Sequence, residues 1–476
     1  MTLPSPASDD QSAVMAFLSR PESYGLHGGV VQRIDTHCSV VFLAGDRAYK
    51  LKRSLRYSSL DYTTRALRKD ACDAELVLNR RTAPALYLSV QSINRDTLGG
   101  LAFDGPGASL DHVVVMRRFA QSDLFDRMLD DGRLTPSLMR SLGEAVARLH
   151  LTAQPTPRFG GCDAIRDAIA NNDRELARVA EELDGAAVAT LGSETRAMLD
   201  GIAGLLDQRR TEGKVRRCHG DLRLANICLY DGAPTLFDCI EFSDEIGCID
   251  VLYDLAFLLM DLTLSGRGDL GNAVFNAYLD LAPETEGLRA LPLFLALRSA
   301  TRSYALAGSA HRRADPAQAA ERLALARRHI DAGLTFLAPH PPLLLVLGGD
   351  ADRVRREMAA LLAARTLPAP GARLLHHGPN EAMVWAEAGG VLAAGCSALV
   401  EGRFADPAEQ GAAVALASRL AVQRIGFWLG SLPADLDPRL WQELQTSDGP
   451  SAAVARAEPL VSTIAGTLRF PIVPPT

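Results

Sequence analysis

One short segment constrains the fold and chemistry of this 476-residue chain more than any other. The stretch Cys218–Asn226 reads Cys-His-Gly-Asp-Leu-Arg-Leu-Ala-Asn and places a carboxylate, Asp221, five residues before a side-chain amide, Asn226. An isolated His-Gly-Asp triplet is equally typical of a tight turn with a capping aspartate. Two further carboxylates, Asp238 and Glu241, follow in the same β-rich stretch. Together these oxygen-bearing side chains favour a reaction site over a simple turn.

The spacing of these groups suits phosphoryl transfer. That reaction needs a group to accept the proton of the acceptor hydroxyl and a metal ion to neutralise charge on the γ-phosphate. Asp221 can accept the proton, and Asn226 can bind Mg²⁺ at the spacing of a kinase catalytic loop. The segment Thr235–Phe242 is predicted to be a strand that supplies the second metal ligand.

Residues 12–335 resemble the aminoglycoside-phosphotransferase-like family, whose motif His-Gly-Asp-x-x-x-x-Asn is followed by an Asp-aromatic element and by Asp-x-x-x-Asp-Leu-Ala. The last element is here Ile249–Ala256. More closely, the chain resembles a bacterial group in which this kinase domain is fused to a C-terminal P-loop kinase-like domain. The stretches YKLK, ELVLNRR, HGDLRLANICL, FDCIEF and DLAFLLMDL carry this resemblance, which covers essentially the whole chain.

The resemblance implies an α/β protein: a bilobal α+β kinase-like domain followed by a small Rossmann-like α/β domain of the P-loop type. It implies ATP and Mg²⁺ as cofactors, Asp221 as catalytic base and Asn226 as a Mg²⁺ ligand. His219 would support the loop from beneath. The second metal ligand stays open: Asp238 is favoured by its distance from Asn226 and its residue type, and Glu241 by its place before an aromatic residue.

The amino-terminal region supplies candidates for binding the nucleotide. Two β-like runs, His37–Leu43 and Arg47–Leu51, predict a hairpin, and the spacing of apolar residues predicts a helix over Thr63–Arg81. In kinases a lysine on such a strand contacts the α- and β-phosphates and pairs with a glutamate on the next helix.

Lys50 and Glu75 fit this pair. Lys52 faces the same side by strand alternation, so either lysine could serve. The predicted strand Asp111–Phe119 carries Met116, which is expected at the adenine hinge. A Gly-x-Gly-x-x-Gly loop is absent from the hairpin, whose tip holds Gly45 alone. Farther along, Asp250 and Asp254 begin an apolar helix, where capping and ordering of the loop are favoured over direct catalysis.

The predicted domains are an N-lobe at 1–120, a helical C-lobe at 121–337 and an α/β domain at 343–476, with a proline-rich break between the last two. In the third part a strand runs into Gly348-Gly349, where a phosphate-binding P-loop would stand. Such a loop needs Gly-Lys-Ser/Thr, but Val354 and Arg355 occupy the last two positions, and Asp350 and Asp352 would oppose an anion. This part is therefore predicted to be a degenerate P-loop domain.

Composition and net charge limit the kinds of partner and the cellular location to be expected. A net charge of −7 gives no electrostatic footprint for nucleic acid, and no apolar run is long enough to span a bilayer, so neither a nucleic-acid nor a membrane partner is expected. The eight cysteines show no metal-binding spacing and are predicted to be reduced in a cytoplasmic protein.

The leading hypothesis is a Mg·ATP-dependent phosphotransferase that acts on the hydroxyl group of an unidentified small molecule. A regulatory pseudokinase or scaffold that binds a protein partner through the C-terminal domain is the alternative. The sequence argues against this alternative, because pseudokinases usually lose one of the catalytic lysine, glutamate, aspartate and asparagine residues, and all four types are present here. Transfer to a protein side chain is not excluded by any feature of the sequence.

Overall fold

The computed structural model describes residues 10–57, 59–311, 315–366, 369–378, 381–404, 406–434 and 436–465. Its contacts divide the chain into two compact units, Met1–Asp131 with Arg216–Ile249, and Gly132–Val215 with Asp250–Thr476. The chain mixes helices and strands in both, which confirms the α/β class. The segment Cys218–Asn226, whose spacing resembles a kinase catalytic loop and which is called the catalytic-loop segment below, thus groups with the amino-terminal sheet. The domain boundaries predicted near residues 120 and 343 stay a prediction.

The first unit is built on a six-stranded antiparallel sheet in the order β1-β2-β3-β8-β6-β7. Its strands are β1 (Gln32–Asp35), β2 (Ser39–Ala44), β3 (Arg47–Lys52), β6 (Tyr87–Arg95), β7 (Leu101–Phe103) and β8 (Ser109–Arg117). The predicted hairpin and the strand through Met116 are therefore confirmed. Two short pairs accompany the sheet, β4 (Arg56–Tyr57) with β5 (Leu60–Asp61) and β10 (Ile227–Tyr230) with β11 (Ala233–Leu236).

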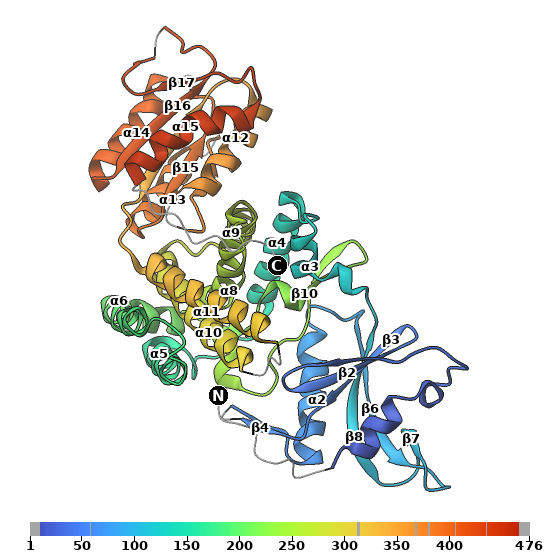
Figure 1. Ribbon diagram of the computed structural model, residues 1–476. Helices are drawn as coiled ribbons and strands as arrows, with labels where there is room; N and C mark the ends of the chain where they lie inside the picture. Colours follow the sequence, from blue (N-terminus) through green and yellow to red (C-terminus); the bar gives the residue numbers. More distant parts are fainter. Residues whose placement is uncertain are drawn as a thin grey trace. The chain divides into compact units, whose positions relative to one another are not determined.

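The sheet has an apolar core on each face because successive side chains of a strand point to opposite sides. Val113 and Val115 of β8 join a core with α1 (Ser12–Leu18), whereas Val114 lies in a core with α2 (Arg65–Asn79). Figure 1 shows α2 alongside the strands.

The unit also contains η1 (Pro21–Tyr24), η2 (Gln121–Asp123), α3 (Phe125–Asp130), η3 (Leu224–Asn226) and α7 (Asp244–Gly247). The short strands β9 (Val215–Arg217) and β12 (Cys248–Asp250) lie where the chain passes between units.

One strand prediction is wrong. The segment Thr235–Phe242 is not a continuous strand, because β11 ends at Leu236 and the following residues form a loop. Asp238 has a φ of 63°, a left-handed conformation that breaks the extended backbone. The two carboxylates, Asp238 and Glu241, therefore stand on a loop after the strand.

The second unit begins with a bundle of helices: α4 (Pro136–Thr152), α5 (Gly161–Ala177), α6 (Gly185–Thr211), α8 (Val251–Leu264), α9 (Gly268–Leu281), η4 (Glu286–Ala290), α10 (Leu291–Ala310) and α11 (Pro316–Leu337). Almost every residue of α8 is buried. Asp250 caps α8 by accepting a hydrogen bond from the Leu252 N–H and forms a buried ion pair with Arg209. Asp254 is fully buried against His150. Both aspartates thus have the structural contacts that the sequence favoured.

A five-stranded parallel sheet follows in the order β14-β15-β13-β16-β17. Its elements are β13 (Leu343–Gly348), α12 (Asp352–Arg365), β14 (Arg373–His376), α13 (Glu381–Ala393), β15 (Ala398–Glu401), α14 (Pro407–Leu420), β16 (Gln423–Leu429), β17 (Gln442–Leu444) and α15 (Pro450–Ala465). Helices α12 and α15 contribute buried residues to a core on this sheet. The predicted alternation of strands and helices is confirmed (Figure 1).

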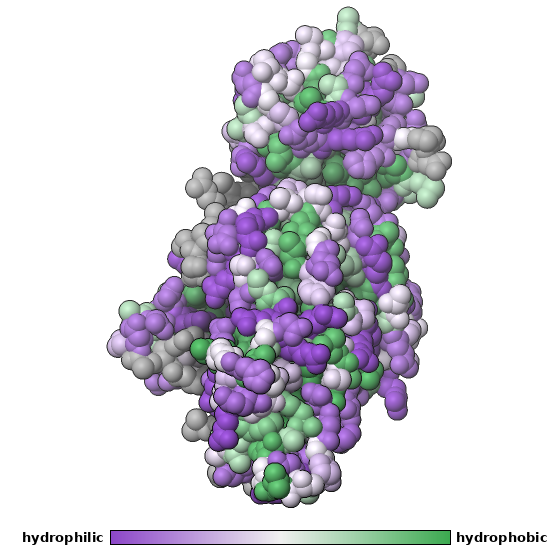
Figure 2. Space-filling view, turned by 90° about the vertical axis from the view of Figure 1, so that its right-hand side faces the viewer, coloured by the Kyte–Doolittle hydropathy of each residue, from purple (hydrophilic) through white to green (hydrophobic). Residues whose placement is uncertain are grey.

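The polarity of the surface and the state of the cysteines agree with what the composition predicted. Hydrophilic residues cover much of the face seen in Figure 2, with hydrophobic residues in scattered groups. Among the described residues, no helix has both the length and the apolar character needed to cross a membrane. All eight cysteines are free, and only Cys38 is not buried.

Candidate active site

Strand β3 aims two lysines at helix α2. Tyr49 and Leu51 lie in the core on one face of the sheet, so the alternating positions Lys50 and Lys52 point to the other face. Glu75 lies on α2, which begins at the N-cap Thr64, whose side chain accepts a hydrogen bond from the Leu67 N–H. The sequence predicted that one lysine would pair with Glu75, and in the structure both do.

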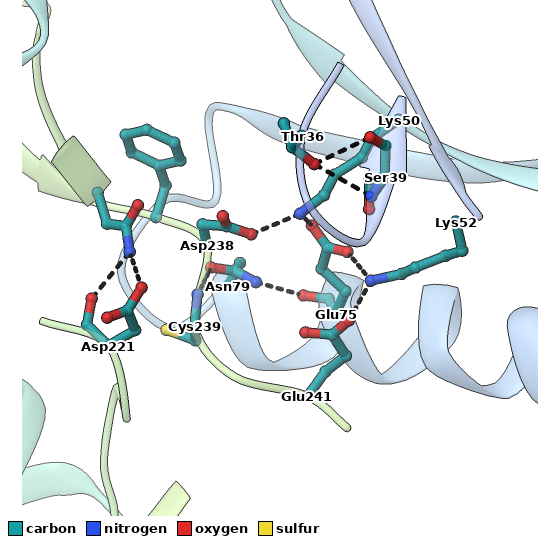
Figure 3. A network of polar contacts seen from close by, with 12 residues as sticks. Thr36, Ser39, Lys50, Lys52, Glu75, Asn79, Asp221, Asp238, Cys239 and Glu241 are labelled. Carbon is teal, nitrogen blue, oxygen red and sulfur yellow. Dashed lines mark hydrogen bonds and ion pairs between the residues drawn. The ribbon is translucent and has the colours of Figure 1, made fainter. Parts of the chain in front are cut away.

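Two lysines and three carboxylates form a network in which positive and negative side chains alternate (Figure 3). Lys50 Nζ lies 2.8 Å from Glu75 Oε1 and 2.5 Å from Asp238 Oδ1. Lys52 bonds to the other oxygen of Glu75 and to Glu241. The Tyr62 hydroxyl donates to the same Glu241 oxygen at 2.5 Å. The order along the network is therefore Asp238, Lys50, Glu75, Lys52, Glu241.

Exposure separates the two ends of this network. The Asp238 side chain is 42% exposed, whereas that of Glu241 is 6% exposed and already engaged by a lysine and a phenol. Likewise, the Lys50 side chain is 12% exposed and that of Lys52 only 1%. The Asp238–Lys50 end is thus the one that a group from solvent can reach, and the Lys52–Glu241 end forms its buried support.

The pKa values of Lys50, Lys52 and Glu75 are shifted towards their charged forms. Burial acts to lower the pKa of both lysines, but the facing carboxylates, Asp238 for Lys50 and Glu241 for Lys52, together with Glu75, outweigh it and raise both pKa values. Burial acts in turn to raise the pKa of Glu75, and the charges and hydrogen bonds of the two lysines overcome it and lower that pKa. The two lysines and Glu75 therefore hold one another in the charged form.

The loop that carries Asp238 is fixed from α2 and β6. The Asp238 N–H donates to the Tyr87 hydroxyl at 3.2 Å, and the Cys239 N–H donates to Asn79 Oδ1 at 2.9 Å. The Thr82 hydroxyl donates to the Leu236 carbonyl at 2.8 Å. These bonds hold the left-handed conformation of Asp238, a conformation that aspartate tolerates better than most residues.

The catalytic-loop segment orders Asp221 through two neighbours. Asn226 Nδ2 donates to Asp221 Oδ2 and to the Asp221 carbonyl, both at 2.8 Å. Arg223 bonds both carboxylate oxygens, with Nε 2.8 Å from Oδ1 and Nη2 3.1 Å from Oδ2. The Asp221 side chain is 27% exposed, so it remains accessible to a substrate.

His219 lies beneath this loop, as the resemblance implied. Its side chain is fully buried, and Nε2 donates to the Phe237 carbonyl at 2.9 Å, since a carbonyl oxygen can only accept. The Ile240 N–H donates back to the His219 carbonyl. The next residue must be glycine: Gly220 has a φ of 87°, and a Cβ there would lie 2.9 Å from the Ile240 side chain. His219 therefore ties the Asp221 loop to the Asp238 loop.

The oxygen donors fit a divalent cation such as Mg²⁺. Because Asn226 Nδ2 faces Asp221, its Oδ1 points away and has no hydrogen-bond partner among the described residues. Asp238 uses only Oδ1 for Lys50, which leaves Oδ2 for a metal. Carboxylate and amide oxygens are the ligands that Mg²⁺ prefers.

Met116, the residue predicted at the adenine hinge, lies on β8 beside Ala48 of β3 and is partly buried against the α2 core.

Sequence reasoning missed several residues that shape the site. Arg223 has a local signal, since it lies two residues after Asp221 within the motif. Tyr62 and Tyr87 have none, because they reach the network only through the folding of distant segments. Arg81 also belongs here: its guanidinium donates to the carbonyls of Arg217 and Cys218, just before the catalytic loop.

Residues 77–291 match the sequence profile of the phosphotransferase enzyme family. This match covers less than half of the chain and shows similarity to that family over these residues. The matched range contains the catalytic-loop segment and both downstream carboxylates, but it begins after Lys50, Lys52 and Glu75. In the structure Lys50 and Lys52 form ion pairs with Asp238 and Glu241, which lie inside the matched range.

Curated relatives are proteins of Mycobacterium bovis and of two strains of Mycobacterium tuberculosis, each described as uncharacterised. Each is 31% identical over 273 residues, which cover 56% of this chain and 53% of the relative. The chain thus spans about half the length of the curated relatives that it matches.

Solved structures of kinases show distant similarity. A choline/ethanolamine kinase family protein from Mesorhizobium loti is 16% identical with a TM-score of 0.40, covering 69% of this chain and 98% of its own. An ethanolamine kinase of Plasmodium vivax is 12% identical with a TM-score of 0.38, covering 64% and 81%. An aminoglycoside 2′-phosphotransferase is 14% identical with a TM-score of 0.42, covering 69% and 100%.

Proposed function

We propose that this protein transfers the γ-phosphoryl group of Mg·ATP to a hydroxyl group of a small molecule, with Asp221 as the base. The observation that carries the proposal is the position of Lys50. Its ammonium bonds Glu75 on α2 and Asp238 on the loop after β11, within the unit that also holds Asp221 and Asn226. A cation, a metal-binding carboxylate, an amide and a base are the parts that phosphoryl transfer requires.

In this proposal Lys50 binds the phosphates while Glu75 and Lys52 hold it in place. Asp238 and Asn226 would hold Mg²⁺, which supplies neutralisation of charge on the β- and γ-phosphates. Met116 would lie at the adenine, on a strand directly hydrogen-bonded to β3. Glu241 is proposed as a support for Lys52 rather than a metal ligand, because it is buried and already paired.

Asp221 would accept the proton of the acceptor hydroxyl as the oxygen attacks phosphorus. Its carboxylate is held in one orientation by Arg223 and Asn226, so the accepting oxygen keeps its position during the reaction. Preorganised groups of this kind stabilise the developing charge without having to reorganise during the step. We propose that the reaction is cytoplasmic, because the cysteines are free. Neither nucleic acid nor a membrane is proposed as a partner, because a net charge of −7 offers no electrostatic footprint for either.

The C-terminal sheet is proposed to lack a second nucleotide site. Arg355, at the position of the P-loop hydroxyl, is buried and bonds Glu401 at 2.5 Å and Asp352 at 2.7 Å. Asp350 pairs with Arg403 at 3.2 Å. The arginine that could attract a phosphate is thus neutralised within the fold, and this degenerate P-loop domain would serve packing or a protein partner.

A screen of hydroxyl-bearing metabolites with γ-labelled ATP tests the proposal. We expect one chemical class to acquire label in the presence of Mg²⁺ with the wild-type protein and not with Asp221→Asn. Tight binding of Mg·ATP without transfer to any metabolite would instead support the regulatory pseudokinase.

A further inference from the structure

Arg298 of α10 is a buried cation with an unusual environment. The residue is 5% exposed. Its guanidinium carbon lies 3.9 Å from the ring centroid of Tyr253 and 4.7 Å from that of Phe257, both on α8. These rings lie one helical turn apart, so two aromatic side chains fix the guanidinium within the helical bundle.

The hydrogen bonds of Arg298 are incomplete. Its Nε donates to the Tyr253 carbonyl at 3.1 Å. Nη2 is fully buried and has no hydrogen-bond partner, and Nη1 has none among the described residues although it is not fully enclosed. Arginine stays protonated in proteins, so a buried guanidinium carries its full charge and needs acceptors for all its N–H groups. The end of this side chain therefore presents two unused donors.

The other buried arginines of the described chain show what Arg298 lacks. Each of them pairs with at least one carboxylate: Arg68 with Asp111, Arg209 with Asp250 and Glu284, Arg355 with Glu401, and Arg373 with Asp280 and Glu387. No described carboxylate lies within ion-pair distance of Arg298. Among the described arginines that are at most 5% exposed, Arg298 thus lacks the carboxylate partner that each of the other four has.

The phenol of Tyr304 lies within electrostatic range of Arg298. Burial, with a contribution from Tyr253, raises the pKa of Tyr304 to about 12, so this phenol adds no negative charge near neutral pH. The carboxylate of Glu175, which also acts on this phenol, is paired with Arg178 at 2.6 Å and forms no ion pair with Arg298.

We propose that Arg298 forms the base of an oxyanion-binding site in the helical bundle, for a ligand that carries a carboxylate or phosphate group. Two oxygens of such a group would accept hydrogen bonds from Nη1 and Nη2 in the paired geometry that guanidinium favours. Tyr253 and Phe257 hold the plane of the fork. The site lies in the second unit and stands independently of the phosphoryl transfer proposed above, and its ligand is an anionic metabolite that regulates the protein.

Titration of the full chain with inorganic phosphate and with succinate, at constant ionic strength and without nucleotide, tests the site. The parent is Lys50→Met, which removes the phosphate-binding lysine of the first unit. We expect saturable binding of at least one anion in calorimetry, weakened at least tenfold by Arg298→Gln, a loss of about 1.4 kcal/mol. Arg289→Gln, at an exposed arginine of the same unit, should leave binding unchanged.

Two results would overturn the proposal: no saturable binding of either anion to the parent, or equal binding when Arg298 is replaced. If the glutamine variant does not fold, Arg298→Lys decides, because it keeps the charge and loses the fork, and unchanged affinity there counts against the site. In turnover assays, an anion that binds at Arg298 should alter the rate of phosphoryl transfer without being phosphorylated itself.

Discussion

The ammonium of Lys50 lies 2.5 Å from Asp238 Oδ1, although the two residues are separated by 188 positions in the sequence. This contact joins β3 to the loop after β11 and sets the distance between a cation and a carboxylate that we assign to the nucleotide and its metal. Glu75 holds Lys50 from the other side at 2.8 Å. Because Lys52 shares Glu75, the arrangement combines an accessible pair with a buried one.

Replacing the two lysines should therefore give different defects. We expect Lys50→Met to lower kcat/KM for ATP by at least about a hundredfold, since a phosphate contact is lost in a low-dielectric site. Its loss of unfolding free energy should be smaller than that of Lys52→Met. Lys52→Met leaves Glu75 and Glu241 buried with one partner fewer, which should cost about 3–5 kcal/mol of unfolding free energy. Urea unfolding and steady-state kinetics on both variants measure this; the reverse pattern would assign the phosphate contact to Lys52.

The metal ligands can be distinguished by their Mg²⁺ dependence. Asn226→Ala and Asp238→Asn each remove an oxygen ligand or its charge, so the Mg²⁺ concentration for half-maximal turnover should rise by about tenfold or more. Glu241→Gln is the matched control, because its carboxylate is occupied by Lys52 and Tyr62. It should lower stability and leave the Mg²⁺ requirement unchanged. A raised requirement in that variant would make Glu241 a ligand.

A buried histidine should give the fold a measurable acid sensitivity. Burial, with the charge of Arg302, lowers the pKa of His329 from 6.5 to about 3. The folded pKa is below the unfolded one, so the unfolded chain takes up the proton first and stability falls as pH drops from about 6.5 towards 3. This one group should cost about 1 kcal/mol between pH 6.5 and 5.5. His329→Gln should reduce the pH slope of the unfolding free energy by that amount; an unchanged slope in this variant contradicts the assignment.

The chain should bind one nucleotide. The wild-type protein should titrate with Mg·ATP to one equivalent, because Arg355 is already bonded by Glu401 and Asp352 and no lysine stands beside Gly349. The double variant Lys50→Met with Asp238→Asn should bind none in calorimetry. A second equivalent that survives this double variant would show a working site on the C-terminal sheet.

Local patterns predicted much of the fold and many of the candidate residues. The hairpin, α2 and the alternation in the C-terminal sheet follow from periodicity within short windows, and strand alternation alone placed Lys50 and Lys52 on one face. The motif around Asp221 is likewise contiguous, so its Asp–Asn contact could be anticipated from spacing.

What the sequence did not predict depends on distant segments meeting. Thr235–Phe242 has the composition of a strand, but its N–H groups donate to Tyr87 and Asn79, and its Phe237 carbonyl accepts from His219; these bonds fix it as a loop. The choice between Asp238 and Glu241 was open in the sequence, because burial separates them and burial is set by Lys52 and Tyr62. Arg298 gave no sequence signal, since its significance lies in the counter-ion that it lacks.

Transfer of label from γ-labelled ATP to the acceptor by wild type and by Asp221→Asn tests the central claim most directly. The variant keeps the size of the side chain and one oxygen beside Asn226, but it cannot accept the acceptor's proton. We predict that kcat falls at least about a hundredfold, the lower end of general-base contributions, while the affinity for Mg·ATP changes little. Full transfer by Asp221→Asn would contradict the assignment of this residue and of the reaction built on it.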